Sequence, residues 1–351
     1  MTNEQWELLL KTVHGETPEK PVTGFIIDSP WIPGWAGIST LQFYSSEQTW
    51  FEANKKAIET FPDITFLPGF WSEFGMCTEP SAFGAKLVWN EYNLPHADKV
   101  ISDISQAGTL SSPNPKTDGL LPFIIQRLVN YQKPIREMGH DIKFAIARGP
   151  LNIASFLLGT TELMMGFMMD PENSHKLLET ITQFTVNWIQ YQKEMFPSIE
   201  GVLVLDDIVG FVGDDECKEY AVPYIKRVFN AIDSKLNFFH NDAPGLISSP
   251  YLKEMNVDLF NFSFEHTMKE IRDLAGPEVA LIGNLPPRDV LAAGTPDIVR
   301  AETRKMAEEF GDPSRVVWSC GGGMPQDVTT ENIRAFKETI DEVVPLITNR
   351  N

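Results

Sequence analysis

The chain contains, at residues 236–242, the stretch LNFFHND, in which a short apolar run ends in polar residues. The stretch RVVWSC at residues 315–320 has the same form and is followed by three glycines. Continuous apolar runs of this length are typical of parallel strands, because such strands are buried on both faces. Both stretches are therefore predicted to be strands that present His240, Asp242 and Cys320 at or just beyond their carboxyl ends.

Eight runs of this kind recur along the 351 residues, separated by helical stretches. The runs are Thr23–Asp28, Ile64–Leu67, Ile142–Ala147, Gly201–Asp206, Leu236–His240, Val257–Phe262, Val279–Gly283 and Val316–Cys320. The helical segments with the clearest apolar spacing are Glu172–Phe196, Glu216–Asp233, Thr295–Phe310 and Thr330–Ile347. This alternation predicts an α/β fold, a single (β/α)8 TIM barrel that forms one domain over residues 1–351. A long aromatic-rich insertion is expected after the second strand, from Pro68 to about Pro122.

The composition argues against several classes of partner. The formal net charge is −19, whereas binding to nucleic acid requires a clustered basic surface. No uncharged apolar stretch reaches the length of about 18 residues that a membrane helix needs. The first residues lack the pattern of a secretory signal, and Cys77, Cys217 and Cys320 form no CxxC pair. A reduced, cytoplasmic setting without membrane or nucleic-acid partners is therefore expected.

Polar side chains recur where the predicted strands end, at the rim on which barrel enzymes build their active sites. They are Asp28, Arg148, Asp206, Asp207, His240, Asp242, Asn261, Asn284 and Cys320. Imidazole, carboxylate and thiolate are zinc ligands, and three protein ligands leave a fourth position open for chemistry. His240, Asp242 and Cys320 are therefore candidate zinc ligands. The alternative is a hydrogen-bonded core histidine, an Asx turn at Asp242 and a buried cysteine.

Two further rim segments have both a functional and a structural interpretation. Asp206 and Asp207 could serve as general acid and base or bind a cation, because paired carboxylates push one another's pKa apart. They could equally cap the following helix. Arg148, ahead of a helix, could hold a substrate carboxylate or could form an ion pair that closes the barrel.

The loops after the first two predicted strands are rich in large apolar residues. They include Trp31, Trp35, Phe70, Trp71, Phe74, Met76 and Phe83. Aromatic residues in rim loops either pack within a lid or form the walls of an apolar pocket. As a group, they favour a substrate with an apolar or aromatic body.

Several segments together resemble the uroporphyrinogen decarboxylase superfamily, from about residue 8 to the C-terminus. The segments that carry the resemblance are 148–151 (RGPL), 157–159 (LLG), 204–207 (VLDD), 220–224 (YAVPY), 257–258 (VD), 282–287 (IGNLPP) with Leu291, 294–296 (GTP), 322–325 (GGMP) and 330–332 (TEN). The resemblance implies a single (β/α)8 barrel. In the decarboxylase proper, an arginine-containing segment after the first strand holds the porphyrinogen carboxylates. The corresponding stretch here, Phe25–Gly34, contains no arginine, which argues against porphyrinogen decarboxylation.

The other branch of the superfamily comprises zinc-dependent, corrinoid-linked methyltransferases with a motif that resembles His-x-Cys…Cys. His240 and Cys320 match this motif, whereas Asp242 stands where the family commonly has cysteine. Whether Asp242 binds zinc directly stays open, as does the fourth position, which could hold water, substrate or a carboxylate such as Glu73. A zinc ion with a carboxylate in place of a thiolate is expected to be a stronger Lewis acid toward oxygen.

The resemblance therefore implies O-demethylation of a small methoxylated aromatic, with a cobamide as methyl acceptor. The chain has no Asp-x-His-x-x-Gly corrinoid motif, so a partner corrinoid protein would supply the cobamide. Substrate contacts are expected from Trp31, Trp35, Trp71, Glu73, Arg148 and Asn284. Two other functions remain open: a metal-free decarboxylase that uses Asp28 or the Asp206-Asp207 pair, and a non-catalytic binding barrel.

Overall fold

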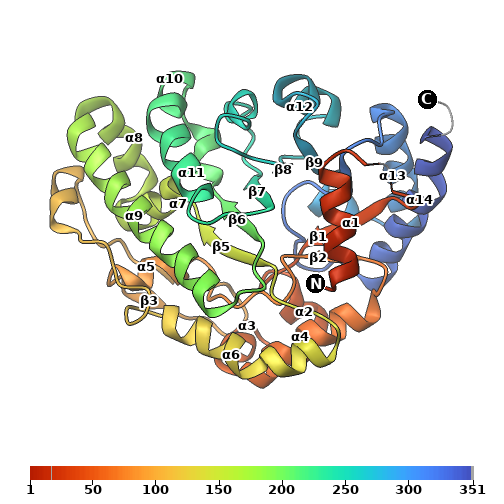
Figure 1. Ribbon diagram of the computed structural model, residues 1–351, viewed down its shortest axis with the longest axis horizontal. Helices are drawn as coiled ribbons and strands as arrows, with labels where there is room; N and C mark the ends of the chain where they lie inside the picture. Colours follow the sequence, from red (N-terminus) through yellow and green to blue (C-terminus); the bar gives the residue numbers. More distant parts are fainter. Residues whose placement is uncertain (17, 349–351) are drawn as a thin grey trace.

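The computed structural model describes residues 1–16 and 18–348. Eight parallel strands form one curled sheet in the order β2-β1-β10-β9-β8-β7-β6-β5, with helices around it (Figure 1). The strands are β1 Val22–Ile26, β2 Thr65–Leu67, β5 Phe144–Arg148, β6 Gly201–Leu205, β7 Leu236–Asn241, β8 Leu259–Phe262, β9 Ala280–Leu285 and β10 Val316–Cys320. All eight overlap the predicted runs, and the (β/α)8 barrel is confirmed.

The helices follow the strands in the alternation that the barrel requires. The α-helices are α1 Asn3–Val13, α2 Ile32–Ala36, α3 Thr40–Ser45, α4 Glu47–Thr60, α5 Thr78–Ala82, α6 Leu121–Glu137, α7 Pro150–Leu158, α8 Thr160–Met169, α9 Pro171–Met195, α10 Asp214–Glu216, α11 Val222–Phe229, α12 Met268–Ala275, α13 Pro296–Phe310 and α14 Thr330–Thr348. The predicted single helix Glu216–Asp233 is wrong in detail. A π-helical turn, Cys217–Ala221, precedes α11, and Pro223 lies in the first turn of α11. The proline lacks the N–H that an unbroken α-helix would use.

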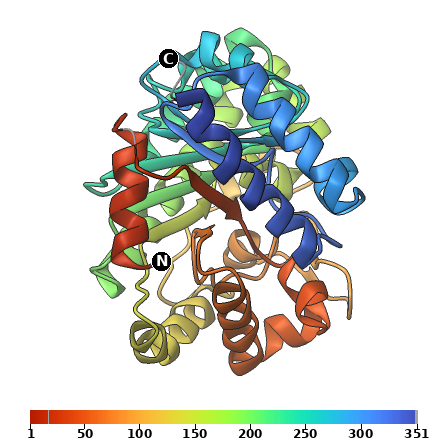
Figure 2. The ribbon, with the colours of Figure 1, turned by 90° about the vertical axis from the view of Figure 1, so that its right-hand side faces the viewer.

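Side chains from the strands form two separate apolar clusters. One lies inside the barrel and contains residues of every strand, for example Phe144, Leu203, Phe238 and Ile282. The alternate strand residues pack outward against the helices, as the period-two geometry of a strand requires. Helix α1 lies beside the strands (Figure 2). Its side chains join the interior cluster, and Trp6 meets the edge of Phe144 with ring centroids 5.3 Å apart. This packing closes the amino-terminal end and leaves the carboxyl ends of the strands for the site.

The hydrogen-bonded strand order begins at β2 and ends at β5. Side chains of the segment after β2, from Phe70 to Glu73, line a cavity with residues of β5. This segment therefore covers the seam between the first and last strands of the sheet. The predicted insertion continues from it and contains α5, a two-stranded ribbon of β3 Leu87–Val88 with β4 His96–Ala97, and the 3-10 turn η1 Ile104–Thr109.

Within the part of the chain that the structure describes, no single helix is long and apolar enough to cross a membrane. One bent pair, α7 with α8, reaches that length and composition only when both helices are taken together.

Candidate metal centre at the barrel mouth

His240 lies near the carboxyl end of β7, and only 6% of the residue is exposed. Its Nδ1 atom is 2.7 Å from Oδ1 of Asn261, and Nδ2 of Asn261 donates a hydrogen bond of 2.8 Å to the carbonyl oxygen of Ile282. Because the second bond fixes the Asn261 amide, its Oδ1 accepts and the Nδ1 atom of His240 carries the proton. In the neutral ring, the Nε2 atom then has the lone pair with which histidine binds a metal.

Two carboxylates lie close to this Nε2 atom. Their nearest oxygens are 3.6 Å away for Asp207 and 4.0 Å away for Asp242. The ligand atoms of all three residues lie within 4.8 Å of one another. Burial raises the pKa of Asp207; His240 opposes this shift and the charge of Asp242 adds to it. One imidazole nitrogen and two carboxylate oxygens are donors that zinc accepts, so this group, which we call the metal group, fits a zinc ion.

Two of the three predicted zinc ligands, His240 and Asp242, thus lie together in the metal group. Asp207, predicted as an acid or base or as a cation ligand, is its third member. Cys320, the third predicted ligand, is not in it. The cysteine is fully buried in the cluster between strands and helices, with its thiol 3.7 Å from the carbonyl oxygen of Gly322. Burial raises the pKa of Cys320 to about 12, so the thiol is protonated in this arrangement.

The glycine loop after β10 lies close to the metal group. Gly322 has a φ of +83°, and a Cβ atom built on it would lie 2.4 Å from Oδ2 of Asp242. A larger residue would therefore displace the Asp242 carboxylate. The loop after Cys320 consequently packs directly against one member of the metal group.

Asp206 points away from the metal group. Its two carboxylate oxygens accept hydrogen bonds of 2.9 Å from the backbone N–H groups of Leu151 and Asn152, at the start of α7. Gly149 allows this approach, because a Cβ atom there would lie 2.2 Å from Oδ2 of Asp206. Asp206 therefore caps α7, which precedes it in the sequence, and not the following helix as the structural alternative had it; Asp207 is the member of the pair at the mouth.

Arg148 is held by two glutamates from the segment after β2. Its Nη2 atom lies 3.0 Å from Oε2 of Glu73, and its Nη1 atom lies 3.2 Å from Oε2 of Glu79. The backbone N–H of Arg148 also donates to Oε1 of Glu79, and Ser29 donates to Oε1 of Glu73. Burial raises the pKa of Glu73, and Arg148 opposes the shift. The structure thus gives Arg148 the ion-pair role that was one of its two interpretations.

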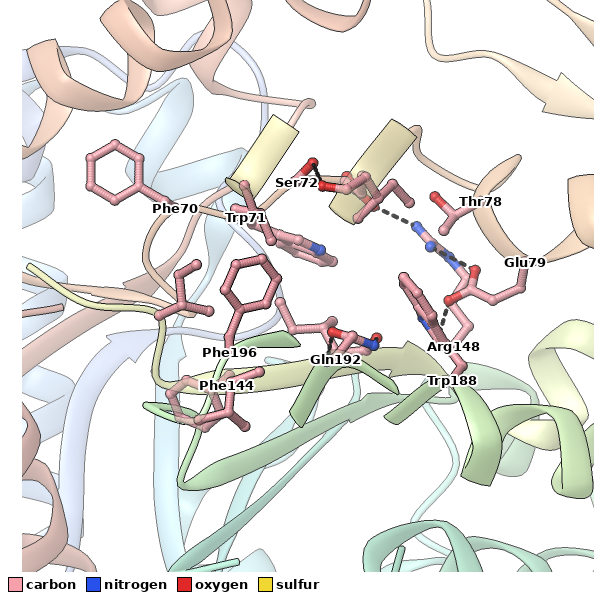
Figure 3. A pocket seen from close by; sticks show the side chains of 16 residues that line it. Phe70, Trp71, Ser72, Thr78, Glu79, Phe144, Arg148, Trp188, Gln192 and Phe196 are labelled. Atoms are coloured by element: carbon pink, nitrogen blue, oxygen red, sulfur yellow. Dashed lines mark hydrogen bonds and ion pairs between the residues drawn. The ribbon is translucent and has the colours of Figure 1, made fainter. Parts of the chain in front are cut away.

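Trp71 lines the seam cavity shown in Figure 3, as do Arg148 and Glu79. Its side chain also packs with the apolar interior of the barrel. The predicted substrate contact from Trp71 therefore remains a prediction.

Trp31 and Trp35, which were also predicted to contact the substrate, do not line this cavity. Their rings stack at 4.9 Å, and their indole N–H groups donate to the carbonyl oxygen of Val328 and the hydroxyl of Thr330. Trp31 is 1% exposed. Both rings pack between the loop after β1 and the start of α14, which corresponds to the lid-packing alternative.

Asn284, at the end of β9, donates its side-chain N–H to the carbonyl oxygen of His266. Its Oδ1 atom is buried without a hydrogen-bond partner among the described residues. The side chain lines a surface pocket with Phe264 and Met306. The predicted substrate contact from Asn284 therefore remains a prediction.

Two residues of the site carried no assigned role in the sequence analysis. Asn261 was noted only as a polar strand end, yet it orients His240. Glu79 lies 69 positions from Arg148 in the sequence, in the insertion, where no local pattern marks it. Asn261 could have been found only from the register of β7 with β8, which pairs it with His240.

A family model described as uroporphyrinogen decarboxylase (URO-D) matches residues 34–343. Curated proteins named uroporphyrinogen decarboxylase are also similar to the chain. The one from Chloroherpeton thalassium is 29% identical over 180 residues, and the match spans 49%, about half, of each protein. The one from Mannheimia succiniciproducens is 22% identical, and the match covers 76% of each protein. The one from Schizosaccharomyces pombe is also 22% identical, and the match covers 95% of this chain and 96% of the other.

Two solved structures share the fold. A methyltransferase from Methanosarcina mazei superposes with a TM-score of 0.79 at 15% identity, over 95% of this chain and 97% of the other. A B12-independent methionine synthase from Shewanella sp. superposes with a TM-score of 0.55 at 12% identity, over 94% and 98%. At these identities the similarity describes the fold alone.

Proposed function

The chain belongs to the uroporphyrinogen decarboxylase family of enzymes, and from this premise we propose that it is a zinc-dependent methyltransferase. It would move a methyl group from a small methoxylated aromatic to a corrinoid protein, which amounts to O-demethylation. The barrel that it shares with a Methanosarcina mazei methyltransferase is compatible with this reaction.

The observation that carries the proposal is the metal group, in which Asn261 leaves the Nε2 atom of His240 free beside two carboxylates. His240 and Asp242 would hold the zinc ion, with Asp207 as the further ligand in reach; Cys320, the third ligand that the resemblance implies, would have to turn toward this group to bind the ion. Zinc, when bound, would act as a Lewis acid toward the ether or phenolate oxygen.

The residues around the metal group have separate tasks. Asn261 keeps the His240 ring in one orientation and one tautomer, as partners of metal-binding histidines do. Trp71 offers an aromatic face to the substrate ring. Glu73 and Glu79 hold the Arg148 side chain in place along the mouth, which limits the orientations that a substrate can take.

The methyl acceptor would be a cobamide carried by a partner protein. None of the six histidines of this chain stands in an Asp-x-His-x-x-Gly motif. The cobamide would therefore have to approach from outside the barrel, over the carboxyl ends of the strands.

A metal-free decarboxylase remains the second candidate, because the curated relatives are named decarboxylases. Its acid would be Asp28, whose pKa is raised by burial and by the charge of Glu73. Because Asp206 caps a helix, the Asp206-Asp207 pair offers only the carboxylate of Asp207 for acid-base chemistry. Decarboxylase activity would persist after removal of metal by a chelator, whereas the proposed methyl transfer would stop.

The proposal is tested by measuring the metal content of the purified protein. We expect about one zinc ion per chain, lost in a His240→Ala variant and kept in His96→Ala, since His96 is an exposed histidine on β4. In the same samples, methyl transfer is followed as conversion of cob(I)alamin to methylcobalamin with guaiacol, a methoxyphenol. A wild-type protein without zinc after growth with added zinc would contradict the proposal, as would equal zinc in the His240→Ala variant.

A further inference from the structure

The guanidinium of Arg148 is already occupied by protein carboxylates. Both of its terminal nitrogens are within 3.2 Å of a glutamate oxygen, from Glu73 and from Glu79. All three side chains are nearly buried, at 11%, 4% and 2% exposed. Figure 3 shows Arg148 and Glu79 facing each other on the wall of the seam cavity. A substrate carboxylate could reach this arginine only by displacing a buried glutamate.

This ion-pair group lies at the same mouth as the metal group. Arg148 pairs with Leu205 in the ladder of β5 and β6, and Leu205 pairs with His240 in the ladder of β6 and β7. Two strand spacings separate Arg148 from His240, which is about 10 Å. A ligand of one aromatic ring that bound at His240 would therefore extend toward Arg148 and Glu73.

The other side-chain carboxylates around this mouth are those of Asp28, Asp207 and Asp242, and a second buried cation, Arg127, donates hydrogen bonds to the backbone carbonyl oxygens of Glu73 and Tyr44. The carboxylate of Asp28 makes no hydrogen bond or ion pair with the described residues, and Asp207 and Asp242 lie on the opposite side. A zinc ion would balance the last two, whereas Arg148 is already paired with two glutamates. A ligand carboxylate would lose its hydration and find no unpaired cation at Arg148, which is a common way of building specificity.

One neutral donor belongs to the same network. The hydroxyl of Tyr44 is buried and has no hydrogen-bond partner among the described residues. Burial and the nearby Glu73 raise the pKa of Tyr44 well above its ordinary value, so the hydroxyl stays protonated.

We propose that Glu73 determines substrate specificity: by occupying Arg148, it makes the site select uncharged methoxylated aromatics and reject those that carry a carboxylate. This inference rests on the proposed function and adds the substrate class. From the sequence, Arg148 was a candidate to bind a substrate carboxylate. Its ion pairs with Glu73 and Glu79 instead make it unavailable to such a carboxylate.

The test compares binding of guaiacol with binding of vanillate, which is guaiacol with an added carboxylate. Each is titrated into the zinc-loaded wild-type protein and followed by calorimetry. We expect guaiacol to bind about tenfold more tightly or better. Equal binding of both compounds, tighter binding of vanillate, or binding of neither would overturn the inference without any variant.

The Glu73→Gln variant removes one negative charge with little change of shape, and Glu172→Gln, at an exposed position on α9, is its matched control. We expect the preference for guaiacol to fall at least about fivefold in Glu73→Gln and to stay unchanged in the control. An unchanged preference in a folded Glu73→Gln protein would overturn the inference. Methyl transfer to cob(I)alamin is measured separately: selective binding without transfer would contradict the proposed function and leave the charge selection standing.

Discussion

The Nδ1 atom of His240 lies 2.7 Å from Oδ1 of Asn261, and the Asn261 amide is itself fixed by its bond to the Ile282 carbonyl. The free Nε2 atom of the histidine therefore depends on one neighbouring side chain. We expect Asn261→Ala to lower zinc affinity by about 10- to 100-fold, because the ring loses its preferred tautomer and orientation. Competition with a chromophoric chelator measures this affinity.

A matched control for Asn261→Ala is Asn237→Ala, at the other end of β7. Asn237 bonds to Ser234 and to the backbone of Asn256, far from the mouth, so its loss should leave zinc affinity unchanged. Wild-type zinc affinity in Asn261→Ala would show that the asparagine does not act on the metal group.

Asp206 and Asp207 are neighbours in sequence with opposite predicted effects. Asp206→Ala should lower the free energy of unfolding by about 2 kcal/mol, since two backbone N–H groups of α7 lose their acceptor in a buried place. Urea denaturation measures this change. Zinc content should stay at the wild-type level.

Asp207→Ala provides the reverse case. Its side chain is 37% exposed and caps no helix, so stability should change little while zinc affinity falls. If Asp206→Ala lost zinc at full stability, Asp206 would belong to the metal site and the capping assignment would be wrong.

The fold was predictable because each strand of the barrel is an uninterrupted apolar run. Phe238 and Phe239, for example, are buried on opposite faces of β7, so both had to be apolar. The rim position of His240 followed from the end of that run. Its bond to Asn261 did not, because it depends on which residues two parallel strands bring side by side.

The direction of individual side chains was harder to predict. Cys320 lies on the helix-facing side of β10 together with Val316 and Trp318, and this alternation was visible in the sequence. Trp31 and Trp71 both follow strands in aromatic loops, yet one packs under α14 and the other enters the barrel interior. That difference is decided by the path of the loops, which local patterns do not encode.

Cys320 lies outside the metal group, and its predicted role as a zinc ligand leads to a test of its thiol. A bound metal ion lowers the pKa of a coordinating thiol enough to deprotonate it, and the glycine loop after Cys320 packs against Asp242. We expect the cobalt(II)-substituted protein to show a thiolate-to-metal charge-transfer absorption band that Cys320→Ser abolishes. Cys217→Ser, a buried cysteine in the π-helical turn, should leave the band intact. Stoichiometric cobalt without the band in the wild-type protein would assign the third ligand to Asp207.

His140 makes the stability of the protein depend on pH in a predictable direction. The ring is 8% exposed, and burial, with a smaller effect of the Met1 amine, lowers the pKa of His140 to about 4. In the unfolded chain its pKa is about 6.5, so the unfolded state binds the proton more readily and stability falls as the pH decreases from about 6.5 to 4. Between pH 7 and pH 5 this residue should reduce the free energy of unfolding by about 2 kcal/mol. Urea denaturation at both pH values measures the loss of stability on acidification. This loss should be smaller by about 2 kcal/mol in His140→Gln and unchanged in His96→Gln. An equal loss of stability in both variants would contradict the assignment to His140.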